Sequence, residues 1–180
     1  MEYLYNHKVQ YRLSIIHTGL HMSFDRLKEA DKRNKKSIDF DFKIKDIAIA
    51  IGETLFWLIA LEDWLLEHSL NYKSNKKERI EEKNYLLGLK HAYNATKHDM
   101  SYVHLFTFRG KEPIAGDGSM IKNDLESDII WIECPDNPKK INQVNNYRRY
   151  IKNQLVISVF EKTIDFLNQE VQEFKQNSYS

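Results

Sequence analysis

Hydrophobic residues recur every three or four positions over most of the chain, the spacing of one face of an α-helix. This pattern predicts a first helix from His7 to about Asp31. A second helix is predicted to begin near residues 42–46 and to continue to about Leu70. At about 1.5 Å per residue it would span roughly 40 Å, long enough for the central rod of a bundle.

Two further helices have the same spacing. The third is predicted over Glu78–Asp99, after a polar break at Asn71–Asn75. The last is predicted over Asn142–Gln176, with an interruption of its apolar stripe near Lys152–Gln154. We therefore expect four to five antiparallel helices that share one core.

Two short segments between the third and last helices have a different composition. Ser101–Arg109 and Asp128–Cys134 are rich in β-branched and aromatic residues, which favours strands. Residues 110–127 between them carry Pro113 and three glycines, as expected of a loop. The predicted fold is mainly α, an antiparallel four- to five-helix bundle in one domain over residues 1–180, with a β-hairpin inserted at about 101–134.

The composition limits the classes of function. A chain of 180 residues with 42% hydrophobic residues is long enough for one domain with a core. Its net charge of +1 provides no overall field toward nucleic acid, so any basic surface must be local. The single cysteine, Cys134, excludes an internal disulfide and a multi-cysteine zinc site, and it fits a reducing compartment.

The apolar segments predict no membrane partner. Residues Met1–Lys8 lack the basic-then-apolar order of a signal peptide, so we expect no export. The most apolar run, Ile47–Leu66, is interrupted by three carboxylates, which are costly within a bilayer. We expect a cytoplasmic protein.

The end of the third helix holds the strongest candidate site. Residues 90–99 include two of the seven histidines, two lysines and an asparagine. Because a helix turns about 100° per residue, His91, Asn94 and His98 lie within about 60° of one another on one stripe. These three side chains are therefore expected to act on a common ligand.

The residues that border this stripe are small or apolar. Leu87, Gly88 and Ala95 would let another helix approach closely, which suggests the cleft of a symmetric homodimer. The opposite side of the helix is expected to face the core. Its residues are Tyr85, Leu89, Ala92 and Thr96.

The segment Tyr93-Asn94-Ala95-Thr96-Lys97-His98 resembles the motif of HEPN domains, Arg-x(4–6)-His, often with Asn after the Arg. The resemblance covers about residues 1–99 and the last helix, with the hairpin as an insertion. It implies a small helical bundle that is commonly dimeric. Active members of the family cut RNA without a metal, and many serve as toxins or in phage defence. Asn94 and His98 match the motif, whereas Tyr93, Ala92 and His91 occupy the positions where its arginine would fall.

The resemblance implies roles for the stripe in RNA cleavage. That reaction needs a base for the 2′-hydroxyl proton, an acid for the leaving oxygen and positive charge at phosphorus. His98 would be one proton carrier and His91 the second, because imidazole suits both roles near neutral pH. Asn94 would orient phosphate or ribose, and Lys90 or Lys97 would supply charge.

Two further residues are expected to support the site. Tyr93 takes the position of the family's arginine. Glu53 is a carboxylate among apolar residues of the second helix, and such a group usually has a partner when it is buried.

Three alternatives compete with catalysis. Asn94 and His98 could instead stabilise the end of their helix. The same face could bind a nucleotide or a partner protein without catalysis. A metal-binding bundle could use His17 and His21, four residues apart on one face, with His91 or His98, although partly exposed histidines are the commoner case and we expect no metal. We also expect no cofactor, because no Gly-rich phosphate cradle is present.

Overall fold

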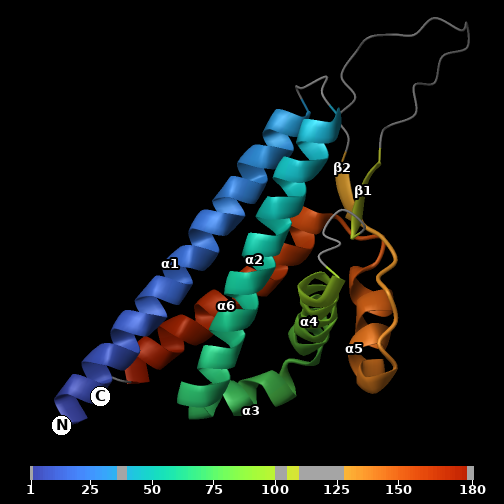
Figure 1. Ribbon diagram of the computed structural model, residues 1–180. Coiled ribbons are helices and arrows are strands. Elements are labelled where there is room, and N and C mark those ends of the chain that lie inside the picture. Colours follow the sequence, from blue (N-terminus) through green and yellow to red (C-terminus); the bar gives the residue numbers. More distant parts are fainter. Residues whose placement is uncertain (1, 36–39, 100–104, 110–127, 178–180) are drawn as a thin grey trace, which may run out of the picture.

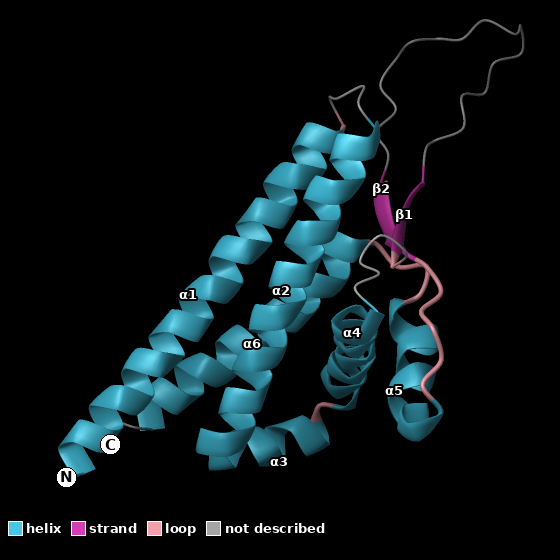
Figure 2. Ribbon diagram, in the orientation of Figure 1, coloured by secondary structure: helices cyan, strands magenta, loops and turns pink. Residues whose placement is uncertain are grey.

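The computed structural model describes residues 2–35, 40–99, 105–109 and 128–177 (Figure 1). Within these ranges, the side chains of residues 2–6, 34, 40–43, 98 and 99 are not described. The described chain is mainly helical with one small antiparallel sheet (Figure 2), which confirms the predicted fold class.

Helices α1 (Glu2–Asn34) and α2 (Phe40–His68) form a long antiparallel pair (Figure 1). Leucines and isoleucines at helical spacing bury the facing sides of both helices, as predicted. Arg26 forms an ion pair with Glu53 at 2.9 Å, and Arg33 forms one with Asp46 at 2.6 Å. These surface pairs stabilise by at most about 1 kcal/mol each, so apolar burial holds the pair together.

The predicted polar break at Asn71–Asn75 is wrong. These residues belong to a short helix, α3 (Leu70–Glu78), which precedes α4 (Ile80–Asp99). Ser69 begins α3 by accepting a hydrogen bond from the backbone N–H of Tyr72 at 3.2 Å. The Tyr72 side chain is fully buried and anchors α3 against the bundle.

The predicted interruption of the last helix is confirmed. A 3₁₀ turn, η2 (Pro138–Lys140), leads into α5 (Ile141–Asn146) and a π-helical turn, η3 (Tyr147–Ile151). After the break the chain continues as α6 (Val156–Asn177). Asn153 adopts the left-handed conformation with φ of 66°, which asparagine tolerates better than most residues. This reversal lets α5 and η3 fold against α4 (Figure 1).

The predicted β-hairpin is present in shorter form. Strands β1 (Phe106–Arg109) and β2 (Asp128–Trp131) pair antiparallel, with Phe106 opposite Trp131. Backbone groups at the α6 break extend the sheet, because the Asn153 N–H donates to the Trp131 carbonyl at 2.8 Å. The predicted strand residues 101–104 and the loop at 110–127 lie outside the described residues.

One hydrophobic core joins the helices and the hairpin. Trp131 of β2 is fully buried beside Tyr147 of η3 and Phe160 of α6. Helix α6 crosses behind α1 and α2. Helices α4 and α5 lie on the side of α2 that is away from α1 (Figure 1). Among the described helices, none is long and apolar enough to cross a membrane.

Candidate functional site

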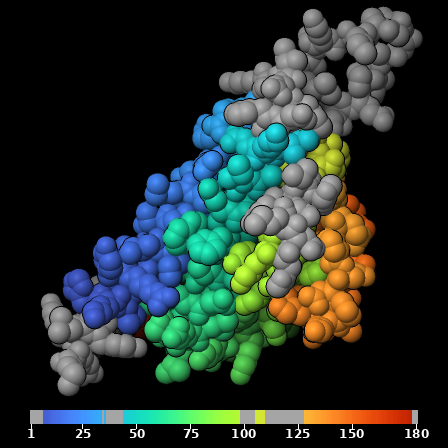
Figure 3. All heavy atoms as spheres, in the orientation of Figure 1, coloured from blue at the N-terminus to red at the C-terminus, as the bar shows by residue number. Residues whose placement is uncertain are grey.

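The face of α4 that was assigned to a dimer cleft is covered by the chain's own η3. A Cβ added to Gly88 would lie 2.5 Å from Cγ1 of Ile151 and 3.2 Å from Cα of Tyr147. In Figure 3 the orange surface of the segment that contains α5 and η3 adjoins the green surface of α4. The small residues on α4 do admit another helical segment, but at Gly88 that segment comes from the same chain.

His91 is enclosed by this contact. Its side chain is only 2% exposed, and its ring lies edge-on to Tyr147 with centroids 5.6 Å apart. Burial lowers the pKa of His91, while the nearby Pro135 backbone acts in the opposite direction. A buried ring of this kind cannot reach an RNA ribose, so the proposed role of His91 as second proton carrier does not fit this geometry.

Asn94 also faces α5. Its Nδ2 donates a hydrogen bond to Oε1 of Gln143 at 3.1 Å, and its side chain is half-buried. His98 continues α4 one turn later, but its side chain lies outside the described residues. The expected stripe is therefore closed at His91 and partly occupied at Asn94.

Lys90 is engaged by α2. Its Nζ donates to Oδ1 of Asp63 at 2.8 Å, and only 28% of its side chain is exposed. Burial alone would lower the pKa of Lys90, but the Asp63 hydrogen bond and the Glu62 charge raise it. Lys90 is therefore positioned to join α4 to α2, not to bind phosphate.

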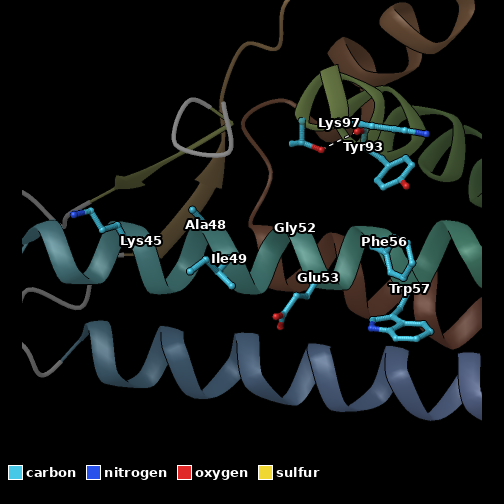
Figure 4. A pocket seen from close by; sticks show the side chains of 10 residues that line it. Lys45, Ala48, Ile49, Gly52, Glu53, Phe56, Trp57, Tyr93 and Lys97 are labelled. Carbon is cyan, nitrogen blue, oxygen red and sulfur yellow. Dashed lines mark hydrogen bonds between the residues drawn. The ribbon is translucent and has the colours of Figure 1, made fainter. Parts of the chain in front are cut away.

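Tyr93 and Lys97 lie on a different face of α4, along an open groove of about 660 Å³ between α4 and α2 (Figure 4). Most of its lining is apolar or aromatic, and Figure 4 shows how the side chains of the two helices border it. The groove is lined by Lys45, Ala48, Ile49, Gly52, Glu53, Phe56, Trp57, Tyr93, Thr96 and Lys97. We call it the α2–α4 groove.

The α2–α4 groove combines exposed apolar surface with positive charge. Ile49 is 51% exposed and Phe56 is 48% exposed. Lys45 and Lys97 are both exposed, and neither forms an ion pair with another described residue. The charge of Glu53 is offset by Arg26, which places Nη1 2.9 Å from both carboxylate oxygens. The described lining thus carries two lysines and one carboxylate already paired outside the groove.

The structure places Glu53 differently from the sequence-based expectation. It has the expected partner, Arg26, but the pair is solvent-exposed and joins α2 to α1. Lys45 and Phe56 were not identified from the sequence. The signal was present, because Lys45, Ile49 and Phe56 repeat at helical spacing on a second stripe of α2 beside its core stripe.

His17 and His21 lie far along the chain from α4 and meet α6. Their Nε2 atoms are 3.3 Å apart, and they lie 2.8 and 3.1 Å from Oδ1 of Asn168. Burial lowers the pKa of His17. Among the described side chains, no three histidine, cysteine or acidic groups are placed to hold a metal ion, so His91 does not complete a site with this pair.

Comparisons of this chain with protein-family models, with curated proteins and with solved structures found no match.

Proposed function

We propose that this protein is a cytoplasmic, HEPN-like helical module of RNA-targeting or phage-defence type, and that it binds single-stranded RNA in the α2–α4 groove. The observation that carries the proposal is the pairing of an aromatic lining with Lys45 and Lys97. Proteins that bind single strands combine basic grooves with aromatic rings on which bases stack.

The dimensions and chemistry of the groove support this assignment. A volume of about 660 Å³ falls in the range of small-molecule sites, so the groove accommodates part of a strand and not a duplex. Phe56 and Tyr93 offer ring faces from opposite helices. Lysine charge attracts phosphates without base specificity, which suits sequence-tolerant binding.

Fluorescence anisotropy with a labelled single-stranded RNA tests the proposal. We expect Lys45→Ala/Lys97→Ala to weaken binding by about ten-fold, about 0.7 kcal/mol per lysine. The matched control is Lys73→Ala/Lys77→Ala, which removes two exposed lysines of α3 and the same charge. Equal weakening in both variants would assign the binding to net charge and reject the groove.

Phe56 provides a second arm of the same test. Phe56→Ala is expected to weaken binding by about 1–3 kcal/mol, because one stacked base loses its platform. Phe56→Leu keeps apolar volume without an aromatic face and should weaken binding nearly as much. Full binding by Phe56→Leu would show that stacking is not used.

Metal-independent RNA cleavage is a second candidate function, and the position of Lys97 favours it. Lys97 lines the groove and lies between Asn94 and His98 in the sequence, so an RNA held there would pass the end of α4. His98→Ala and Asn94→Ala are compared with the unmodified chain on mixed RNA in chelator. Cleavage lost with His98→Ala supports the enzyme, and equal background in all three contradicts it.

We also propose that the chain forms a homodimer through the outer face of α1. Tyr11, Ile15 and Met22 are exposed there and share one helical stripe. Light scattering should give twice the chain mass of 21.5 kDa, and Ile15→Lys/Met22→Lys should give the single-chain mass. An unmodified protein that is monomeric at high concentration would reject the dimer.

A further inference from the structure

The contact of α1 with α6 brings three potential metal-ligating atoms close together. His17 and His21 stand one turn apart on α1, with ring centroids 4.6 Å apart and planes inclined at 76°. Their Nε2 atoms are separated by 3.3 Å. Oδ1 of Asn168, from the middle of α6, lies 2.8 Å from the first and 3.1 Å from the second. The three atoms form a compact triangle.

The size of this triangle matches one face of a small coordination polyhedron. In a tetrahedral zinc site with bonds of about 2.0–2.1 Å, adjacent ligand atoms lie about 3.3 Å apart. The separation of the two Nε2 atoms has this value, whereas the two distances to Oδ1, 2.8 and 3.1 Å, are hydrogen-bond distances that would lengthen by up to about 0.5 Å around a tetrahedral ion. Two imidazole nitrogens four residues apart on a helix are a recurrent half of zinc sites.

Hydrogen bonding alone uses these donors less fully. One amide oxygen accepts from both rings only when each ring carries its proton on Nε2, and the two nitrogens then face each other with no hydrogen bond between them. With the protons on Nδ1, both Nε2 atoms and the amide oxygen carry lone pairs within 3.3 Å of one another. A cation bound between them would accept all three.

We propose that His17, His21 and Asn168 bind one divalent transition-metal cation of the zinc class between α1 and α6, with water completing the coordination. The residues are half-buried, so the site has a solvent-facing side for that water. Imidazole nitrogen suits zinc, copper and nickel, whereas magnesium and calcium prefer oxygen ligands. The site is separate from the α2–α4 groove and shares no residue with it.

Two nearby charges set the expected strength. Asp25, one turn after His21, is negatively charged, but Lys28 forms an ion pair with it at 2.7 Å and offsets its attraction for a cation. Lys175 of α6 acts electrostatically on His17 and opposes one. The two ligands from α1, His17 and His21, bind as neutral imidazoles, and the Asn168 amide adds no negative charge. We therefore expect moderate affinity that a carboxylate at position 168 would increase.

Binding would link the first and last long helices of the bundle. Because a cation that binds only the folded chain shifts the folding equilibrium toward it, saturating metal should raise the thermal midpoint. The sequence pointed to His17 and His21 but not to Asn168, which lies 147 residues from His21. Because amides are seldom counted among candidate metal ligands, Asn168 could be identified as the third ligand only from the folded structure.

The test is a Zn²⁺ titration of the full chain, free of tag histidines and stripped with chelator, against a chromophoric competitor. We expect one equivalent to bind. His17→Ala and His21→Ala should each weaken binding by about ten-fold or more. His7→Ala is the matched control, since His7 is an exposed histidine on the same helix, and it should leave binding unchanged. Asn168→Asp should bind more tightly than the unmodified chain.

Several outcomes would overturn the site. No saturable equivalent of Zn²⁺ would leave only a hydrogen-bonded cluster. Equal weakening by His7→Ala would indicate scattered surface binding. Circular dichroism identifies any variant that fails to fold, and Asn168→Asp, which adds a ligand charge instead of removing a ligand, still decides: affinity no greater than that of the unmodified chain would reject Asn168 as a ligand.

Discussion

At the scale of single residues, Gly88 and His91 explain why the end of α4 is less open than its sequence indicates. The absent side chain of Gly88 admits η3 to within contact of the α4 backbone, and the same contact encloses His91. A helical wheel of α4 places His91 and Asn94 on one polar stripe. It does not reveal that Tyr147 and Gln143 of the same chain contact these two side chains. Within the described part of the stripe, His91 and Asn94 serve the packing of α5 and η3 against α4.

Gly88→Ala tests this contact. The added methyl would overlap Ile151 and press on the Tyr147 backbone, a cost of about 1–3 kcal/mol for overpacking. The gain of about 1 kcal/mol in helix propensity offsets part of it. We expect a net loss of up to about 2 kcal/mol in urea unfolding. Ser14→Ala, at an exposed site of α1, is the control, and a Gly88→Ala protein as stable as that control would refute the contact.

Glu170 is a second decisive residue, because it is a buried carboxylate on α6. Its side chain is 2% exposed and accepts hydrogen bonds of 3.3 and 3.0 Å from Nδ2 of Asn75. Burial raises the pKa of Glu170 above its ordinary value of 4.5, while the Asn75 hydrogen bond acts in the opposite direction. The folded chain therefore holds this proton more tightly than the unfolded chain does.

The sign of the pH effect follows from linkage. Below pH 4.5 the carboxyl is protonated in both states and costs no stability; as the pH rises through 4.5 toward the raised pKa, stability is lost. Glu170→Gln should remove this loss, so the variant should be more stable than the unmodified chain at neutral pH. Thermal unfolding across pH 4–7 measures it, with Glu161→Gln, at an exposed site of the same helix, as control. A variant with an unchanged pH slope would contradict the assignment.

At the scale of elements, the sequence predicts those that carry their own local signal. The long helices are set by apolar spacing, and the break at Lys152–Gln154 was visible as a gap in that spacing. Helix α3 was missed because its single buried anchor, Tyr72, produces no periodic stripe. The α2–α4 groove was missed because periodicity identifies buried faces, and it does not tell which exposed apolar residues the fold gathers beside a neighbouring helix.

The N-terminus of α3 is the helix end whose sequence determinant is clearest. Ser69 satisfies the backbone N–H of Tyr72, so Ser69→Ala should cost about 1 kcal/mol of stability. Ser69→Asp keeps an acceptor at the same position and should retain most of that stability. Urea unfolding of both variants measures the difference. Equal loss in the two would attribute the effect to packing around position 69 and not to the cap.

At the scale of the whole molecule, the fold places three groups of residues on separate surfaces, which the sequence alone does not distinguish. The outer face of α1 exposes Tyr11, Ile15 and Met22, the α1–α6 contact holds His17 and His21, and the α2–α4 groove carries two exposed lysines. With a net charge of +1, the chain has no general attraction for RNA. Any RNA affinity must therefore come from a local surface, and its salt dependence counts the phosphates that this surface neutralises.

The most direct measurement is the affinity for labelled single-stranded RNA over a range of salt concentrations, for the unmodified chain and for Lys45→Ala/Lys97→Ala. For single strands the slope of log affinity against log salt is about −0.7 per phosphate neutralised. If Lys45 and Lys97 each neutralise one phosphate, the slope of the variant will be shallower by about 1.4. Equal slopes for the two proteins, or no binding by the unmodified chain at low salt, would contradict RNA binding in the α2–α4 groove.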